Sequence, residues 1–305
     1  MWKQAIHNFL ETNQIAFQSV QNQSVFELLF IPHHQLYLHL INIESFRETQ
    51  LPNNYFQNLS EQQNANGFRI IHLWEDVWMS QKDLVQSRIL TMIGIFKRLN
   101  ARHCFIERID KPTADKFLND NHLQGGVKAK FKYGLFLKWQ YVEQYLGISQ
   151  FDQILSILSQ KNIKNRQDTD NLPINLLAVA TFSGGRLMTE ETRKGQRSYE
   201  LLRFASLRGY AVMGGINKLL KSFQSEHNPD DIMTYADRDW SDGRSYKMLG
   251  FERIEIIEPQ AFMVDNQTFK RFSAKENIEN SIKIFNSGSI KFIKKISKNH
   301  ISNAQ

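Results

Sequence analysis

The architecture of the chain follows from YELLRFASLRGYAVMGGINKLLKSF at residues 199–223 and DIMTYADRDWSDGRSYKMLGF at residues 231–251. Each of them predicts a strand followed by a helix, and the first helix is entered through Gly214 and Gly215. A helix entered in this way presents unpaired backbone N–H groups at its positive end. This end suits an anion such as a pyrophosphate, although a tight turn and close packing explain a glycine pair equally well.

The same alternation continues on both sides and predicts a mixed α/β layer in the order β-α-β-β-β-α-β-α-β. Strands are predicted at residues 102–109, 132–139, 175–182, 199–206, 231–240 and 251–259. Helices are predicted at residues 112–123, 214–227 and 242–250. A polar, helix-rich insertion is predicted at residues 140–171.

This order, with Tyr246 four residues before Gly250 and Phe251, resembles the acyl-CoA-binding half of the GCN5-related N-acetyltransferase (GNAT) fold over residues 101–265. The resemblance implies that acetyl-CoA or another acyl-CoA is the cofactor. It places the pyrophosphate on backbone amides near Met213, Gly214, Gly215 and Asn217, with Lys218 adding charge. It also implies three catalytic roles: Tyr246 protonates the CoA thiolate, Glu200 is the candidate general base, and Asp237 is the second candidate.

More narrowly, NDNHLQG, ELLRF, GGINKLL and YADRDWSDG resemble a GNAT-like module of phage and mobile-element proteins. The ELLRF and TYAD stretches are also similar to phage enzymes of GNAT fold that modify adenine in DNA. Two positions depart from the family pattern. The family has Arg or Gln where Ala211 stands, and Gly or Ala where Ile216 stands.

The first hundred residues carry a second pattern. Strands are predicted at residues 25–32, 35–43 and 68–74, followed by a helix at 78–99. The succession ELLFIP, QLYLHLIN and FRIIHLWEDVW resembles very-short-patch-repair-type endonucleases, a branch of the PD-(D/E)XK fold. That resemblance implies acidic metal ligands at the positions of Leu28 and His39, so the segment is expected to be a degenerate nuclease domain without its metal site.

Other acidic and histidine residues of this segment do not restore a metal site. Glu27 has the chemistry of a Mg²⁺ ligand, but one residue along a strand points to the opposite face. Glu75 and Asp76 form an acidic pair for which metal binding and helix capping are both open. The histidines His33, His34 and His72 lack the spaced partners of a zinc site.

The formal net charge of +7 is concentrated towards the C-terminus. Residues 1–100 carry 7 basic and 8 acidic side chains, whereas residues 270–305 carry 8 and 2. Contacts with DNA or RNA are therefore expected from this basic tail and from the lysine–aromatic run near residue 130, each of which also fits a solvated surface. The candidate lysines are Lys128, Lys130, Lys132, Lys291, Lys294 and Lys295.

Composition bounds the remaining possibilities. A single cysteine, Cys104, excludes a disulfide framework and a multi-cysteine zinc site, and it is expected to be a small buried side chain. The sequence contains neither a bilayer-spanning apolar run nor a signal peptide, so a soluble, cytoplasmic protein without a membrane partner is expected.

The predicted fold class is α/β, with a mixed-sheet GNAT-like domain preceded by a small α/β restriction-endonuclease-like domain. The predicted division is 1–100 for the nuclease-like domain, 101–265 for the acyltransferase domain and 266–305 for a basic tail. The predicted function is acyl-CoA-dependent N-acylation of an amine acceptor that the sequence does not identify, with a nucleic acid or a nucleic-acid-associated target as the candidates. The alternative is a non-catalytic DNA-binding, homing-endonuclease-like protein of a phage or mobile element.

Overall fold

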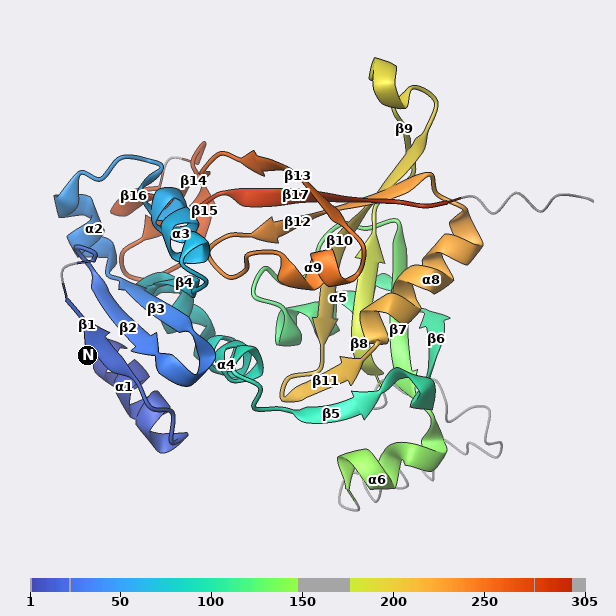
Figure 1. Ribbon diagram of the computed structural model, residues 1–305, viewed down its shortest axis with the longest axis horizontal. Helices are drawn as coiled ribbons and strands as arrows, with labels where there is room; N and C mark the ends of the chain where they lie inside the picture. Colours follow the sequence, from blue (N-terminus) through green and yellow to red (C-terminus); the bar gives the residue numbers. More distant parts are fainter. Residues whose placement is uncertain (1, 22, 148–175, 277, 298–305) are drawn as a thin grey trace, which may run out of the picture. The chain divides into compact units, whose positions relative to one another are not determined.

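The computed structural model describes residues 2–21, 23–147, 176–276 and 278–297 (Figure 1). Within them the chain forms a mixed α/β protein with mixed sheets, which confirms the predicted fold class. The described residues make two compact units, one from 1–86 with 235–293 and the other from 87–234 with 294–297. The predicted division at residue 100 separates domains by function. Compact units do not test such a division, so it stays a prediction.

Unit 1 combines an N-terminal segment of the chain with a C-terminal one. Its helices are α1 (Trp2–Thr12), α2 (Ile43–Thr49), α3 (Tyr55–Ala65), the first part of α4 (Glu75–Met92) and α9 (Arg244–Met248). Its strands are β1 (Gln18–Val20), β2 (Glu27–Ile31), β3 (Leu36–Ile41), β4 (Arg69–Trp74), β13 (Glu252–Ile257), β14 (Ala261–Asp265), β15 (Arg271–Ser273), β16 (Ser281–Phe285) and most of β17 (Ser289–Lys295).

The N-terminal strands of unit 1 form a sheet in the order β1-β2-β3-β4. Strands β2 and β3 are antiparallel and joined by a turn at Pro32–His34, whereas β3 and β4 are parallel. All six residues of β3 are buried, so this strand is covered on both faces. Such strands read as continuous apolar runs, as LYLHLI does apart from His39.

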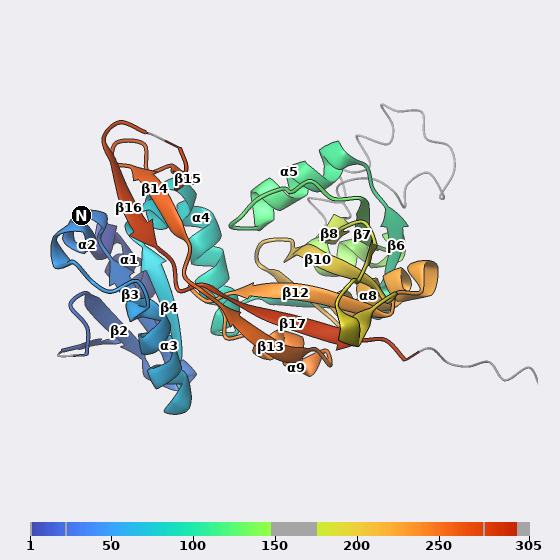
Figure 2. The same cartoon turned by 90° about the horizontal axis from the view of Figure 1, so that it is seen from above.

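A second small sheet, in the order β15-β14-β16, completes the core of unit 1. Val264 of β14 and Ile284 of β16 are fully buried in one cluster with Phe56 and Trp74. Both views show β14 and β16 beside the N-terminal strands (Figures 1 and 2). The segment after residue 259, in which the sequence predicts no strand, therefore supplies core strands as far as β17.

Unit 2 is built around a sheet in the order β12-β10-β8-β7-β6, with β9 on β10 and a separate parallel pair of β5 and β11. Its strands are β5 (Lys97–Asn100), β6 (Cys104–Arg108), β7 (Phe131–Leu137), β8 (Leu176–Phe182), β9 (Arg186–Leu187), β10 (Arg197–Ser206), β11 (Tyr210–Met213) and the first part of β12 (Asp231–Asp237). Its helices are the end of α4, α5 (Lys111–Asn121), α6 (Val142–Leu146) and α8 (Gly215–His227).

Helices α5 and α8 cover opposite faces of this sheet (Figure 2). Phe223 of α8 stacks on Phe182 of β8, with ring centroids 3.9 Å apart. Val179, three residues earlier and so on the other face of β8, belongs to a buried cluster with Phe117 of α5. Helix α5 begins at Asp110, whose carboxylate accepts a hydrogen bond from the backbone N–H of Thr113 at 2.9 Å, as expected for an N-cap.

The strands and helices predicted from residue 102 to 259 are present in the predicted order, with β9 and β11 added between them. The helix predicted at 78–99 is partly wrong. It ends at Met92, and Lys97–Asn100 form β5. The chain turns at Gly94, where φ is 86°, and Lys97 then donates its N–H to the carbonyl of Gly209. The predicted insertion at 140–171 lies outside the described residues from 148 onwards.

The contribution of the C-terminal strands to unit 1 can be measured by unfolding. Ile284→Ala removes a fully buried side chain and is expected to lower the free energy of unfolding by about 2–5 kcal/mol. The matched change Ile254→Ala, on β13 where the side chain is 48% exposed, is expected to cost less than about 1 kcal/mol. Urea titration followed by tryptophan fluorescence checks both, and equal losses would contradict the described core.

Candidate functional site

Strand β10 of unit 2 changes its partner along its length. It pairs in parallel with β12 over three residues, of which the last is Glu200, opposite Met233. From Leu201 onwards it pairs with β8, and the register slips by one residue between Leu201 and Arg203. The ladder with β12 therefore ends at Glu200, immediately before a β-bulge, a feature that is over-represented next to active sites.

The glycine pair after β11 opens helix α8. Gly214 has φ 76°, a left-handed conformation that favours glycine. A Cβ at Gly215 would lie 3.0 Å from Cβ of Val212 and 3.2 Å from Cδ2 of Leu135, so these side chains would have to shift to admit a larger residue. Backbone geometry and packing thus account for both glycines without a ligand.

The first turn of α8 has unpaired amides. The first backbone bond of the helix runs from the N–H of Lys218 to the carbonyl of Gly214 at 2.9 Å. The N–H groups of Gly215, Ile216 and Asn217 form no hydrogen bond within the part of the chain that the structure describes. Three amides at the positive end of a helix can bind an anion.

Two of the predicted cofactor residues differ in what they offer. Met213 is half-exposed at the end of β11, next to the free amides. Lys218, expected to add charge, instead donates its ammonium to the carbonyl oxygens of Ala101 at 2.9 Å and Cys104 at 2.5 Å. Its charge is held at the connection between β5 and β6.

The pair of β5 and β11 supplies a cation that sequence reasoning missed. Leu99 and Val212 are register partners and both are buried, so they face inward. The neighbouring partners, Arg98 and Ala211, therefore face outward, and Arg98 is exposed. Arg98 thus lies across from Ala211, the position where the GNAT pattern has a basic or amide residue. No local signal in the sequence identifies this register.

Glu200, the candidate base, is held by β10 and the segment before β9. Its backbone N–H donates to Ser183 Oγ at 2.9 Å, and its carbonyl accepts from the N–H of Ser183 at 2.9 Å. Burial raises the pKa of the half-buried carboxyl above its usual 4.5, against the charge of Arg203, which lowers it. A carboxylate with a raised pKa is suited to accept a proton near neutral pH.

Tyr246 and Asp237 belong to unit 1, whereas Glu200 and residues 213–218 belong to unit 2. The ring of Tyr246 packs on Phe251 and Phe292, with centroids 5.6 Å away in each case. Asp237 accepts the N–H of Asp239 at 3.0 Å within the turn that follows β12. The catalytic roles of Tyr246 and Asp237 stay predictions.

The first three candidate lysines for nucleic acid lie at the start of β7. Residues 133–137 of this strand are buried, so β7 presents no alternating basic face. Lys132 donates to the carbonyl of Ala129 at 3.0 Å. Lys128 and Lys130 precede the strand and are exposed.

The other three candidate lysines lie on β17. Lys291 forms an ion pair with Glu255 of β13 at 2.9 Å. Burial, and secondly the charge of Lys221, lowers the pKa of Lys294. Lys295, the last residue of the strand, is exposed.

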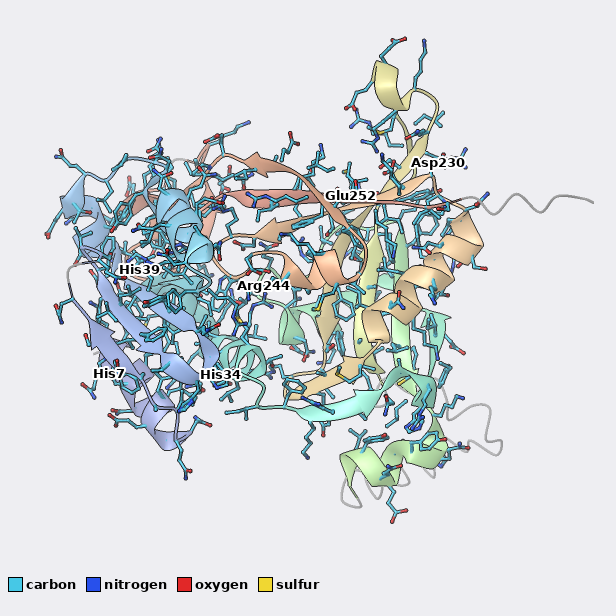
Figure 3. The ribbon with its side chains drawn as sticks, viewed as in Figure 1. His7, His34, His39, Asp230, Arg244 and Glu252 are labelled. Atoms are coloured by element: carbon cyan, nitrogen blue, oxygen red, sulfur yellow. The ribbon has the colours of Figure 1, made fainter. Side chains whose placement is uncertain are left out.

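In unit 1, His39 (labelled in Figure 3) stands where the nuclease resemblance implies a metal ligand. It forms a hydrogen bond with another histidine. His39 of β3 and His72 of β4 are register partners, both fully buried, with their Nδ1 atoms 2.9 Å apart. Leu28, the other implied ligand position, is fully buried. Among the described residues, no group of three or more His, Cys, Asp or Glu side chains is placed to hold a metal ion.

The histidine pair is the centre of a longer chain of hydrogen bonds. The hydroxyl of Tyr55 donates to Ser24 Oγ at 3.0 Å, and Ser24 Oγ lies 2.7 Å from Nε2 of His39. At the other end, Nε2 of His72 lies 2.8 Å from Ser60 Oγ. The chain links β3 and β4 to α3 and to the segment before β2.

The hydrogen bonds at Ser24 determine which atom donates and which accepts at each step of this hydrogen-bond network. Ser24 Oγ accepts from both Tyr55 and the backbone N–H of Phe26, so its own proton is left to point at His39. His39 then carries its proton on Nδ1 and donates to His72, which carries its proton on Nε2. This assignment follows from the hydrogen-bond network, as tautomers generally do.

Both imidazoles are neutral. Burial lowers the pKa of His39 from 6.5 to about 3, and the charge of Lys3 adds to this. Burial also lowers the pKa of His72 well below 6.5, together with the neighbouring His39 and Arg238. The hydrogen bond between the two Nδ1 atoms needs one donor and one acceptor. Neutral imidazoles can provide this, because only one of the two Nδ1 atoms then carries a proton.

The acidic residues of WEDVW have protein partners. Glu75 accepts from Asn42 Nδ2 at 2.7 Å and from the N–H of Ile43 at 3.2 Å, at the start of α2. The buried Asp76 binds Arg271 of β15 through Nε at 2.5 Å and Nη2 at 3.1 Å. Structural roles therefore account for both carboxylates.

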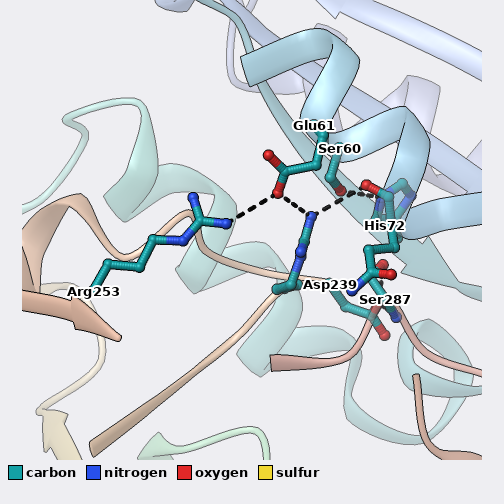
Figure 4. A network of polar contacts seen from close by, with 8 residues as sticks. Ser60, Glu61, His72, Asp239, Arg253 and Ser287 are labelled. Carbon is teal, nitrogen blue, oxygen red and sulfur yellow. Dashed lines mark hydrogen bonds and ion pairs between the residues drawn. The ribbon is translucent and has the colours of Figure 1, made fainter. Parts of the chain in front are cut away.

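Further ion pairs and hydrogen bonds join the rest of unit 1 to this region (Figure 4). Glu61 of α3 binds the buried Arg238 at 2.7 Å and Arg253 at 3.3 Å. Asp239 accepts from the N–H and the hydroxyl of Ser287, at 2.8 and 2.7 Å. Burial, and secondly the nearby Asp237, raises the pKa of Asp239 to about 7.

Two comparisons with known proteins found no match. No protein-family model matches it. No curated protein matches it either. Of the described helices, none is long and apolar enough to cross a membrane.

Some solved structures are similar at a low level. One is the NatC complex bound to Gag peptide and CoA, with 9% identity and a TM-score of 0.32 over 64% of this chain and 99% of that one. Another is the ribosomal-protein-S18-alanine N-acetyltransferase from Escherichia coli, with 10% identity and a TM-score of 0.34 over 65% and 97%. A third is AtaTR bound with AcCoA, with 14% identity and a TM-score of 0.29 over 60% and 94%. Similarity at this level does not assign the chain to a family.

The neutral histidine pair predicts acid sensitivity of unit 1. Because the folded pKa values lie below the unfolded value of 6.5, the stabilisation is complete above about pH 6.5 and is lost as the pH falls towards 3. Asp239, with a raised pKa, acts in the opposite sense, since its ionisation on going from pH 4 to 7 destabilises the fold. The prediction therefore compares the pH dependence of stability in the parent protein with that in a variant without the histidine pair.

Urea titrations at about pH 6.5 and 4.5 measure this difference for the parent and for the double variant His39→Leu/His72→Leu. The parent is expected to lose more stability on acidification than the variant, which keeps Asp239 but lacks the pair. The same pH dependence in both proteins would refute the neutral pair.

Proposed function

We propose that unit 2 binds an acyl-CoA at the start of α8 and that the protein transfers the acyl group to an amine. The observation that carries this proposal is the row of unpaired N–H groups on Gly215, Ile216 and Asn217. A pyrophosphate can accept all three bonds at the positive end of the helix. Met213 and Gly214 bring the chain to this point.

Arg98 supports the proposal by supplying charge on the strand pair that leads into α8. It faces outward on β5 opposite Ala211, about 4.8 Å away across the strand pair. Its guanidinium lies 5.7 Å from the ring of Phe96, and it can bind phosphate oxygens in a bidentate way. Arg98 thereby compensates for the absence of a basic residue at Ala211.

Glu200 supports the second part of the proposal. The amine must lose a proton to attack the thioester carbonyl carbon, and a carboxylate with a raised pKa can take that proton. The new C–N bond forms as the C–S bond breaks, and the CoA thiolate leaves with a proton. Tyr246 as the donor of that proton, and Asp237 as a second base, stay predictions.

The alternative is a binding protein without catalysis. Ile216 favours it, because a branched side chain stands where the GNAT pattern has Gly or Ala. Titration with acetyl-CoA separates the two functions, since only the transferase requires the cofactor.

Acetyl-CoA binding is expected to depend on Arg98 and to be independent of Lys97. Arg98→Gln removes a charged hydrogen bond to phosphate and is expected to weaken binding about 10-fold to 100-fold in isothermal titration calorimetry. Lys97→Gln removes the neighbouring cation, which faces the other way, and is expected to have little effect. Absence of heat with the parent protein would refute the proposal, and equal effects of the two variants would refute the role of Arg98.

The role of Glu200 has its own signature. Glu200→Gln is expected to lower kcat by about 10²–10⁴-fold while leaving the Kd for acetyl-CoA unchanged. Because the base works ionised, kcat/KM of the parent is expected to fall as the pH drops through a pKa above 4.5, and this acidic limb is expected to vanish in the variant. These rates are measured by thiol release with a panel of amines. An unchanged limb would exclude Glu200 as the base.

A further inference from the structure

Two basic segments meet at the Glu200 end of the unit 2 sheet. Residues 127–132 contain three lysines and no acidic residue, and residues 183–197 contain four basic and two acidic residues. The backbone N–H of Lys130 donates to the carbonyl of Phe182 at 3.0 Å. A Cβ built on Gly184 would lie 3.3 Å from Cδ of Lys130, so the lysine stem runs along this glycine.

Strand alternation puts Arg186 on the same face as Glu200. Arg186 of β9 is the register partner of Ser198, and Ser198 is two residues before Glu200 on β10. Directly opposite residues share a face, as do residues two apart in a strand. Gly185 lies on the other face, because a Cβ there would come within 2.7 Å of the ring of Tyr199.

The hairpin that carries Arg186 is held in place. Arg193, in the short 3₁₀ turn between β9 and β10, binds the buried Asp231 of β12 at 2.6 Å. Asp231 also accepts from the hydroxyl of Ser198 at 2.5 Å. Figure 1 shows β9 and the start of β10 extending beyond the other strands of this sheet.

The remaining cations of the two segments are available to a ligand. Arg193 is neutralised by Asp231, and the exposed Glu190 and Glu191 are confined to the tip of the hairpin. Five other basic side chains are exposed and form no ion pair within the described ranges of the chain. They are Lys128, Lys130, Arg186, Lys194 and Arg197.

From this arrangement we infer that the acceptor amine belongs to a nucleic acid, which binds along the β9–β10 ribbon and the 127–132 segment beside Glu200. The ribbon is two strands wide, and a two-stranded ribbon fits the major groove of a duplex. Exposed cations at its base and along the flanking segment match a row of phosphates. The inference rests on the proposed function for the role of Glu200, whereas the binding itself does not require acyl-CoA.

Fluorescence anisotropy of a short labelled DNA duplex, with the full chain and without acyl-CoA, tests the binding. The parent is expected to bind with an affinity that falls as salt rises. Lys130→Gln/Arg186→Gln is expected to weaken binding about 10-fold to 100-fold and to reduce the log–log salt slope by about 2. The matched control Lys111→Gln/Lys116→Gln removes two exposed cations of α5, which pair with Asp115 and Asp120, and is expected to leave binding unchanged.

Several results would overturn the inference. They are no binding by the parent, equal loss in the test and control variants, and equal competition by polyglutamate and unlabelled duplex at the same charge concentration. The last result would mean that the ligand is an acidic protein.

Acetyl-CoA titration of the same proteins keeps the two proposals separate. Lys130→Gln/Arg186→Gln is expected to bind acetyl-CoA as the parent does. A parent that binds duplex but gives no heat with acetyl-CoA would retain the nucleic-acid surface and refute the transferase.

Discussion

The pairing of β10 with two different strands is the constraint on which unit 2 depends. Its one-residue bulge between Leu201 and Arg203 reverses the alternation of faces along the strand. Glu200 and Ala205, which are five residues apart, consequently lie on the same face, and Ala205 packs in the cluster of α5. The bulge therefore brings the candidate base to the side of the sheet reached by the segment between α5 and β7, which carries Lys128 and Lys130.

Unit 1 depends on polar groups that are buried but paired. His39 binds His72, and Asp76 binds Arg271, so the residues with metal or acid–base chemistry have partners within the protein. Removing one member of such a pair leaves the other unsatisfied, which makes the pairs mutually dependent. The nuclease resemblance of this segment stays a prediction.

Local patterns predicted most of the elements from residue 102 to 259, because their apolar residues repeat with strand or helix periods. They could not predict β5 and β11. These two short strands form by pairing with each other, beginning with Lys97 and Tyr210, which are far apart in the sequence. The same limit applies to the candidate site. Gly214 and Glu200 could be identified from the sequence. Pairing between distant segments determines the position of Arg98, the bulge and the carbonyl partners of Lys218, so these could not be predicted.

The dependence of Trp74 and Phe56 on Ile284 has a consequence for the nascent chain on the ribosome. Residues 2–86 leave the ribosome before the strands that complete their core exist. At ordinary rates of synthesis, about 10–40 s pass before residue 284 follows residue 74. Except for its last residues, unit 2 is synthesised within this interval, so it can fold before unit 1. During this time the apolar side chains of the N-terminal strands remain exposed. Chaperone binding during translation is thus expected to centre on the N-terminal segment.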